Sequence, residues 1–166
     1  MERILVIGCP GAGKSILAKR LHALTGLPLY HLDLIWHLPD RSHVPQEVFD
    51  RRLSEILAQE RWILDGNYGR TLEQRLAACD TVLLLDYPLD VCLSGAEARI
   101  GKKRSDLPWV EEQFDGEFRQ WILDFPRTQL PQIYELLARV GSEKEVLIFH
   151  AREEAEEWIQ TRKERS

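Results

Sequence analysis

The residues of this chain that are best suited to chemistry form one short segment, GCPGAGKS, at residues 8–15. An apolar run precedes it and predicts a strand, and the apolar spacing that follows it predicts a helix. A glycine-rich loop in this position, ending in Lys14 and Ser15, is typical of loops whose backbone N–H groups bind nucleotide phosphates. In such a loop Lys14 reaches the β- and γ-phosphates, and the Ser15 hydroxyl holds Mg²⁺. The residues predicted to contact the nucleotide are Gly8, Pro10, Gly11, Ala12, Gly13, Lys14, Ser15 and Ile16.

The residue types of this loop have physical reasons. Glycines let the backbone turn and approach an anion closely, and the helix that follows offers unpaired N–H groups and the positive end of its dipole. A larger side chain at Gly13 is therefore expected to block the phosphates. The alternative is an ordinary glycine-rich turn, but the full pattern arises by chance in only about six of a thousand chains of this length. We therefore interpret the segment as a nucleotide-binding loop.

Carboxylates follow three further predicted strands, and ligands of open α/β sheets bind at the carboxyl ends of strands. A carboxylate beside a nucleotide can hold the waters of Mg²⁺ or accept a proton from an acceptor hydroxyl. For Asp33 we favour such a function. Asp65 is explained equally well as a turn residue before Gly66, and Asp86 is better explained as the cap of a helix that begins near Pro88.

The loop after the third predicted strand, DGNYGR, carries further side chains that suit a bound acceptor. The residues predicted to contact the acceptor are Asp33, Trp36, Asp65, Gly66, Asn67, Tyr68 and Arg70. Trp36 offers an indole ring for stacking on an acceptor ring, although packing within the protein explains it somewhat better.

A basic cluster, Arg99, Lys102, Lys103 and Arg104, adjoins a polar segment that is broken by glycine and proline. Phosphoryl transfer spreads negative charge over the moving group, and arginines on a mobile segment neutralise that charge while excluding water. The alternative is a solvated run of charges. We treat the two interpretations as equal for Arg99 and Arg104, and we expect Lys102 and Lys103 to be solvated.

Positioning these residues requires a sheet whose strands end together. Strands are predicted at residues 4–7, 27–32, 62–64, 81–85 and 146–149. Helical spacing separates them, at residues 46–59, 72–78, about 88–99, 111–123, 131–140 and 151–165, with a break around Pro126. Strands that alternate with helices and are apolar throughout predict a parallel sheet covered on both faces. The expected fold is therefore one doubly wound, five-stranded α/β domain over residues 1–166.

The composition of the chain indicates which general class of protein it belongs to. The 166 residues are 44% hydrophobic and 30% charged with a net charge of −5, which predicts a globular chain without broad nucleic-acid binding. The first predicted strand begins almost at the first residue and no apolar run has the length of a membrane span, so we expect a cytoplasmic protein. The three cysteines and five histidines show no metal-binding spacing. Cys9 is interpreted as a small filler residue in the loop rather than an oxidisable one.

Together these segments resemble a known family. GCPGAGKS is similar to the GxPGxGK loop of adenylate kinases and related small kinases, with Pro10 at the family's proline. LPLYHLD, WILDGNY, LLLDYPLDVCL and RSD resemble, in order, stretches of the adenylate-kinase-like proteins known as DNA topology modulation proteins. The resemblance extends from Ile4 to about Trp121.

This resemblance implies a P-loop NTPase fold, similar to that of nucleoside-monophosphate kinases, which binds ATP and Mg²⁺. It implies an acceptor-binding region at about residues 33–60 and a short lid at about residues 99–114. Matched by position, Ser15 and Asp65 would serve the metal, Arg99 and Arg104 would be lid arginines, and Arg152 would lie near the adenine.

The chain departs from the family pattern in two places. Adenylate kinases continue the DG turn with an aromatic residue and then Pro-Arg, whereas Asn67, Tyr68, Gly69 and Arg70 stand here. Gly95 stands where near relatives are expected to have a basic residue.

The expected function is an ATP-dependent small kinase acting on a nucleotide or another small molecule, with Lys14, Asp33, Arg99 and Arg104 as its catalytic residues. For a hydroxyl acceptor Asp33 is the best candidate base, whereas a phosphate acceptor needs none. The alternative is a nucleotide-dependent regulator of DNA topology or gene expression that uses hydrolysis as a switch. An uncoupled ATPase is the third possibility.

Overall fold

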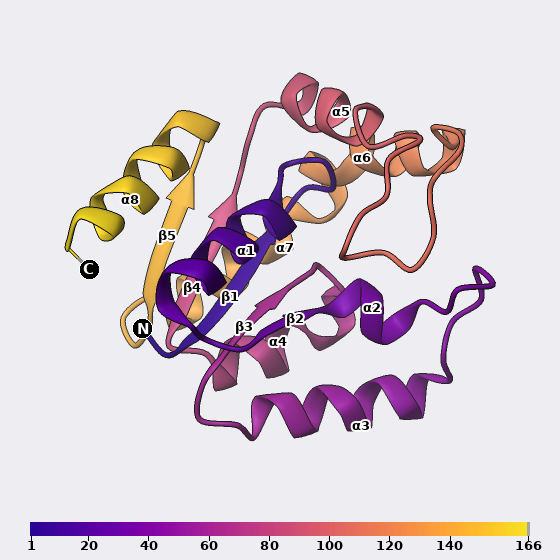
Figure 1. The fold of residues 1–166 in the computed structure, drawn as a ribbon. Coiled ribbons are helices and arrows are strands. Elements are labelled where there is room, and N and C mark those ends of the chain that lie inside the picture. The colour runs from indigo at the N-terminus through magenta and orange to yellow at the C-terminus, as the bar shows by residue number, and fades with distance from the viewer. Residues whose placement is uncertain (166) are drawn as a thin grey trace.

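The computed structural model describes residues 1–165 and contains one five-stranded sheet (Figure 1). Its strands are β1 (Arg3–Gly8), β2 (Leu29–His31), β3 (Trp62–Asp65), β4 (Thr81–Leu85) and β5 (Glu145–Phe149). All neighbouring strands pair in parallel, in the order β2-β3-β1-β4-β5. The predicted five-stranded parallel α/β sheet is therefore confirmed.

Helices cover both faces of this sheet. They are α1 (Lys14–Thr25), α2 (Leu32–Trp36), α3 (Gln46–Leu57), α4 (Gly69–Ala78), α5 (Leu89–Glu97), α6 (Gly116–Thr128), α7 (Leu130–Val140) and α8 (Arg152–Arg165). Helices α1 and α8 pack together on one face, while α4 and α7 lie behind the sheet in Figure 1. The chain first adds β2 and β3 on one side of β1 and then β4 and β5 on the other side. Because crossovers between parallel strands are right-handed, this reversal puts helices on both faces of the sheet.

The centre of the sheet is apolar because it is covered on both sides. Ile4, Leu5, Val6 and Ile7 of β1 are fully buried, as are Val82, Leu83 and Leu84 of β4. Continuous apolar runs of this kind are what a two-sided parallel sheet requires. None of the helices described is long and apolar enough to cross a membrane.

The second strand is shorter than predicted, and Asp33 does not end it. The strand β2 is an edge strand that pairs only with β3, and that ladder stops at His31 opposite Asp65. Beyond His31 the backbone has no further partner strand, so it turns into α2, whose first turn contains Asp33. Asp33 still lies at the carboxyl edge of the sheet, two residues past the observed end of β2.

The predicted break around Pro126 is wrong, as is the predicted helix start at residue 111. Asp115 caps α6 by accepting a hydrogen bond from the Glu117 backbone N–H at 3.2 Å, so the helix begins at Gly116. The helix then continues through Pro126 to Thr128. Pro126 stands in the last turn, where its missing N–H removes only one hydrogen bond from the end of the helix.

Candidate functional site

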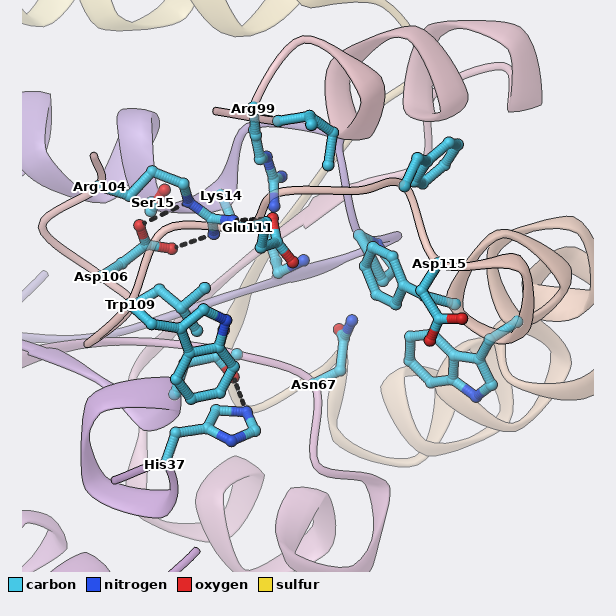
Figure 2. Close-up of a pocket in the computed structure, with 18 of the residues that line it drawn as sticks. Lys14, Ser15, His37, Asn67, Arg99, Arg104, Asp106, Trp109, Glu111 and Asp115 are labelled. Atoms are coloured by element: carbon cyan, nitrogen blue, oxygen red, sulfur yellow. Dashed lines mark hydrogen bonds and ion pairs between the residues drawn. The ribbon is translucent and has the colours of Figure 1, made fainter. Parts of the chain in front are cut away.

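A cavity of about 870 Å³ opens at the carboxyl edge of the sheet (Figure 2). Its walls come from the glycine-rich loop, α2, the end of β3 with the loop after it, and the segment that joins α5 to α6. That joining segment, residues 98–115, has neither helix nor strand and contains the predicted lid. The location agrees with the rule that ligands of open α/β sheets bind where the strands end.

The glycine-rich loop is held in shape by close backbone contacts. A Cβ at Gly11 would lie 1.9 Å from the Cys92 carbonyl oxygen, and a Cβ at Gly95 would lie 2.0 Å from the Gly11 carbonyl oxygen. The loop and α5 therefore touch backbone to backbone. This contact explains why Gly95, where near relatives are expected to have a basic residue, cannot carry a side chain here.

Gly13 has a different requirement. It takes the left-handed conformation with φ of 100° just before α1, and a Cβ built on it meets no protein atom within 4 Å. Its own backbone conformation, rather than neighbouring protein atoms, favours glycine at this position. The space around it is therefore open to a ligand, which fits the predicted approach of phosphates.

Lys14 and Ser15 both line the cavity, as does Pro10. The Lys14 ammonium donates to the carbonyl oxygens of Gly8 at 2.9 Å and Cys9 at 3.2 Å. Burial and the nearby Arg99 guanidinium lower the pKa of Lys14, against the influence of nearby carboxylates. A polyanion bound beside Lys14 would stabilise its charged form against burial and against the repulsion of Arg99, so the site suits phosphate groups.

Asp65 lies at the end of β3, buried in the cavity wall. Its Oδ2 is 2.6 Å from His31 Nδ1, and both side chains are buried. Burial raises the pKa of Asp65, while the hydrogen bond to His31 and the charge of Lys14 oppose that rise. Keeping this carboxylate charged while it is buried lowers the free energy of unfolding. A buried ionisable group of this kind in a cavity wall is typical of a functional site.

We expect Asp65→Asn to separate stability from activity. A raised folded-state pKa means that the protonated carboxyl contributes stability at low pH, and this is lost as the pH rises through that pKa. Asparagine stays neutral and can still accept from His31, so the unfolding temperature at pH 7 should be unchanged or higher. Transfer activity should fall roughly ten- to a hundredfold if the carboxylate orders the Mg²⁺ waters.

The control is Asp86→Asn, at another strand end outside the cavity, which should leave activity unchanged. A lower unfolding temperature at pH 7 with full activity would show that Asp65 is structural.

The predicted capping role of Asp86 is wrong, because Pro88 is the N-cap of α5 and makes no side-chain cap. The Asp86 carboxylate instead accepts a hydrogen bond from the Tyr134 hydroxyl, because α7 packs close to the end of β4.

Asp33 and Tyr68 form a pair on the cavity wall. The Tyr68 hydroxyl donates to Asp33 Oδ1 at 2.7 Å, and His37 Nε2 lies 3.9 Å from the same oxygen. Burial, together with the charge of Asp33, raises the pKa of Tyr68, so its hydroxyl stays protonated and keeps donating. Both residues were predicted to contact the acceptor, and both line the cavity.

Trp36 does not line the cavity. Its ring stacks on His43 with centroids 4.1 Å apart and meets the rings of Phe49 and Tyr68 edge-on. The structure therefore favours the packing interpretation of Trp36. From this position its ring packs against the Tyr68 ring, which does line the cavity.

The loop after β3 holds the glycine-rich loop in place. The Asn67 side-chain amide accepts from the Gly8 N–H at 3.1 Å and donates to the Gly8 carbonyl at 2.6 Å. Gly66 packs against Leu32, where a Cβ would lie 2.8 Å from that side chain. Asn67 lines the cavity, but its amide is occupied by the first residue of the predicted phosphate loop.

Arg70 points away from the cavity. Its guanidinium pairs with the Asp50 carboxylate on α3, with Nη2 2.6 Å from Oδ1, and both side chains are about half exposed. The arginine that was predicted to contact the acceptor therefore forms an exposed ion pair with another residue of the protein. Arg70 is not one of the described residues that line the cavity.

Arg75 is the structural residue that sequence reasoning missed. It is fully buried on α4 and donates to the backbone carbonyls of Gly66 at 2.8 Å and Tyr68 at 3.0 Å, and also to that of Asn67. It thereby fixes the loop that carries Asn67 and Tyr68. The signal was present in the sequence, because Arg75 falls on the same helical stripe as Leu72 and Leu76.

Arg99 and Arg104 both line the cavity, from the segment after α5. Arg104 is paired with Asp106, Nη2 to Oδ2 at 2.7 Å, and with Glu111, Nη1 to Oε2 at 3.1 Å. Burial opposes the charge of Arg104, but these two carboxylates outweigh it and raise its pKa. Burial and the charge of Arg104 lower the pKa of Arg99, which leaves Arg99 as a cation that gains from an incoming anion.

The remaining predicted residues lie around the loop. Lys102 and Lys103 are exposed, as predicted. Arg152 Nη2 lies 3.3 Å from the Gly11 carbonyl oxygen, outside the cavity wall, and Ile16 is exposed on α1. Within residues 1–165 no group of three or more His, Cys, Asp or Glu side chains is arranged to hold a metal. Ser15 and Asp65, the two residues predicted to serve the metal, both line the cavity, and an oxygen from each is the kind of ligand that Mg²⁺ uses together with nucleotide phosphates and waters.

Comparison with known proteins places the chain among small kinases. No family model matches it. It is 30% identical to an adenylate kinase of Cyanothece sp. over 166 aligned positions, covering 78% of this chain and 84% of that protein. It is 35% identical over 94 residues to an adenylate kinase of Clavibacter michiganensis, covering 45% of this chain and 46% of that protein.

Solved structures agree on the fold. The shikimate kinase of Bacteroides thetaiotaomicron superposes with a TM-score of 0.56 at 19% identity, covering 98% of this chain and 96% of that one. The shikimate kinase of Acinetobacter baumannii, solved with shikimate, gives a TM-score of 0.61 at 18% identity, covering 97% and 90%. None of these proteins is named as a DNA topology modulation protein, so that narrower resemblance stays a prediction. With 30% identity over most of both chains, and with a phosphate loop built into one cavity, the chain belongs to the adenylate kinase family of P-loop kinases.

Proposed function

We propose that the protein is an ATP-dependent phosphotransferase that transfers the γ-phosphoryl group to a small-molecule acceptor. One observation carries this proposal: Lys14, Ser15, Asp33, Arg99 and Arg104 all line the same cavity. The phosphate loop and a candidate acceptor-binding carboxylate thus line a single space. Its adenylate kinase relatives support the same reaction class.

Each group has a role that its geometry supports. The N–H groups at the start of α1 and the Lys14 ammonium would hold the triphosphate. Arg99 would neutralise charge on the transferring group, because its guanidinium lines the cavity next to Lys14. Ser15, with Asp65 acting through water, would hold Mg²⁺, which neutralises charge on the phosphates when it is bound.

The segment at residues 98–115 would exclude water during transfer. It contributes Arg99, Arg104, Leu107 and Trp109 to the cavity wall, and Arg104 ties it together through Asp106 and Glu111. Exclusion of water favours transfer to an acceptor over hydrolysis. No observation favours a role as a regulatory switch, so we do not propose one.

A binding screen followed by a turnover assay tests this function. Mg²⁺–ATP at ten times its dissociation constant should stabilise the fold by about 1.4 kcal/mol, which raises the unfolding temperature by roughly 3–5 °C. Acceptors that add a further shift are then tested for release of ADP. We expect ADP release to depend on the acceptor. Release at the same rate with and without every acceptor would instead identify an ATPase.

A further inference from the structure

The contact between His31 and Asp65 joins the ends of two neighbouring strands. His31 ends β2 and Asp65 ends β3, and the two residues are partners in the parallel ladder. Their side chains therefore leave the sheet on the same face at its carboxyl edge. His31 Nδ1 lies 2.6 Å from Asp65 Oδ2, and the two side chains are only 9% and 7% exposed. The sheet itself thus brings a buried imidazole to a buried carboxylate of the cavity wall.

Packing beyond this pair fixes the backbone of both strand ends. Leu32 and Gly66 directly follow His31 and Asp65, and a Cβ on Gly66 would lie 2.8 Å from the Leu32 side chain. The Gly66 N–H also donates to the Val6 carbonyl oxygen of β1 at 3.2 Å. Because β1 leads directly into the phosphate loop, the backbone of Asp65 has a fixed position relative to that loop. The side-chain torsions of Asp65 are what remains to be fixed.

One oxygen of the Asp65 carboxylate remains available to the cavity. Lys14 does not bind it, because the Lys14 ammonium donates to the carbonyl oxygens of Gly8 and Cys9. His31 is its hydrogen-bond partner among residues 1–165, and it occupies Oδ2. Since an ionised carboxylate only accepts hydrogen bonds, His31 Nδ1 is the donor. Oδ1 is therefore the oxygen that a ligand or its bound waters can use.

His31 also lies near the segment at residues 98–115. Burial acts to raise the pKa of Asp106, but the hydrogen bond and charge of Arg104 and, to a smaller extent, the charge of His31 lower it below its usual range. Asp106 lines the cavity and is held by Arg104 (Figure 2). The imidazole thus has carboxylates of β3 and of this segment nearby, and Nδ1 is the ring nitrogen that binds Asp65.

We propose that His31 is a positioning residue of the Mg²⁺ site. By holding Oδ2 it keeps the Asp65 carboxylate in one orientation, with Oδ1 presented to the waters of the metal. This inference rests on the proposed function, in which Asp65 serves Mg²⁺ through water. Side chains that orient a metal-binding group in this way commonly contribute about ten- to a hundredfold to metal affinity.

The test uses variants of His31 that differ in the position of one amide. Asparagine places its side-chain nitrogen where histidine has Nδ1, whereas glutamine places it near the position of Nε2. His31→Asn can therefore still donate to Asp65 Oδ2, His31→Gln cannot donate from the same place, and His31→Leu has no donor. Metal affinity is measured without turnover, with Mn²⁺ and the β,γ-imido analogue of ATP. The full-length protein is in excess over this analogue, and electron paramagnetic resonance reports free Mn²⁺.

We expect His31→Leu and His31→Gln to weaken Mn²⁺ binding about tenfold or more, and His31→Asn to retain most of it. The affinity for the ATP analogue in the presence of EDTA should be equal in all variants, because Asp65 serves the metal. Adding His31→Leu to Asp65→Asn should weaken Mn²⁺ binding little further, because both substitutions remove the same interaction. The control is His22→Leu, which removes an exposed histidine whose Nδ1 lies 2.7 Å from the Leu27 carbonyl oxygen outside the cavity, and which should leave Mn²⁺ affinity unchanged.

The outcomes separate this inference from the proposed function. Equal Mn²⁺ affinity in His31→Asn and His31→Gln overturns the positioning role while the phosphotransferase function stands, and a lower unfolding temperature with unchanged Mn²⁺ affinity does the same. The comparison of asparagine with glutamine decides even where His31→Leu does not fold. If the unchanged protein fails to bind Mn²⁺ together with the ATP analogue, the proposed function and the role of His31 are both overturned.

Discussion

Replacing Lys14 with alanine is expected to lower the rate of phosphoryl transfer at least about a thousandfold. The Lys14 ammonium is held at the loop by the Gly8 and Cys9 carbonyls and has no carboxylate partner among the described ion pairs, so its charge is available to an incoming anion. The measurement is kcat for ADP release with saturating acceptor. Binding of Mg²⁺–ATP should weaken as well, because in the proposed function the lysine also holds the phosphates before transfer.

The fold should survive this substitution. Lys14 donates to two carbonyls of its own loop and makes no ion pair among residues 1–165. The unfolding temperature without nucleotide is therefore expected to change little, and Lys163→Ala, an exposed lysine on α8, provides the matched control. Retained turnover in purified Lys14→Ala protein would contradict the assignment of the loop as the site of the reaction.

The sequence predicted the phosphate loop and the sheet because both are locally encoded. GCPGAGKS can be recognised from its own residue types, because its glycines take positive φ, and the apolar runs of the strands do not depend on distant partners for their periodicity. The same locality explains why the ends of α5 and α7 were predicted well. Element ends that depend on a tertiary partner were predicted less well, as the early end of β2 shows.

The directions of side chains could not be predicted from the sequence. Arg70 was predicted to contact the acceptor and Arg104 to serve as a lid arginine, yet Arg70 meets Asp50 from α3 and Arg104 meets two carboxylates of its own segment. Trp36 was a candidate for ring stacking, but His43 and Phe49 lie close enough in the fold to pack around it. Each outcome depends on which residues the fold brings together, which neither periodicity nor spacing encodes.

The acceptor side of the cavity depends on the position of one loop. Asn67 binds Gly8 of the phosphate loop, and Tyr68 binds Asp33 on α2, although these partners are far apart in the sequence. Tyr68 takes a left-handed backbone conformation with φ of 33°, which a tyrosine adopts only when surrounding contacts compensate for the strain. The buried guanidinium of Arg75 supplies those contacts by binding the carbonyls on both sides of the turn.

Arg75→Leu is therefore expected to lower both stability and activity. Leucine fits the apolar stripe of α4 but leaves the carbonyls of Gly66, Asn67 and Tyr68 without their donor, at a cost of roughly 2–4 kcal/mol. For a chain of this size that cost lowers the unfolding temperature by roughly 5–15 °C. Burial lowers the pKa of Arg75 to about 9, so the guanidinium is still protonated and donating at pH 7.

A second variant separates loss of the loop from general loss of packing. Leu76→Ala removes a buried side chain of the same helix without touching the loop carbonyls, and it should cost about 2–5 kcal/mol. If Arg75 acts by fixing the loop, Arg75→Leu should weaken Mg²⁺–ATP binding at a temperature where both variants are fully folded, because Asn67 would no longer hold Gly8. Leu76→Ala should bind Mg²⁺–ATP normally at that temperature. Equal ATP affinity in the two variants would mean that Arg75 supports the core alone, and that the Asn67 and Tyr68 contacts persist without it.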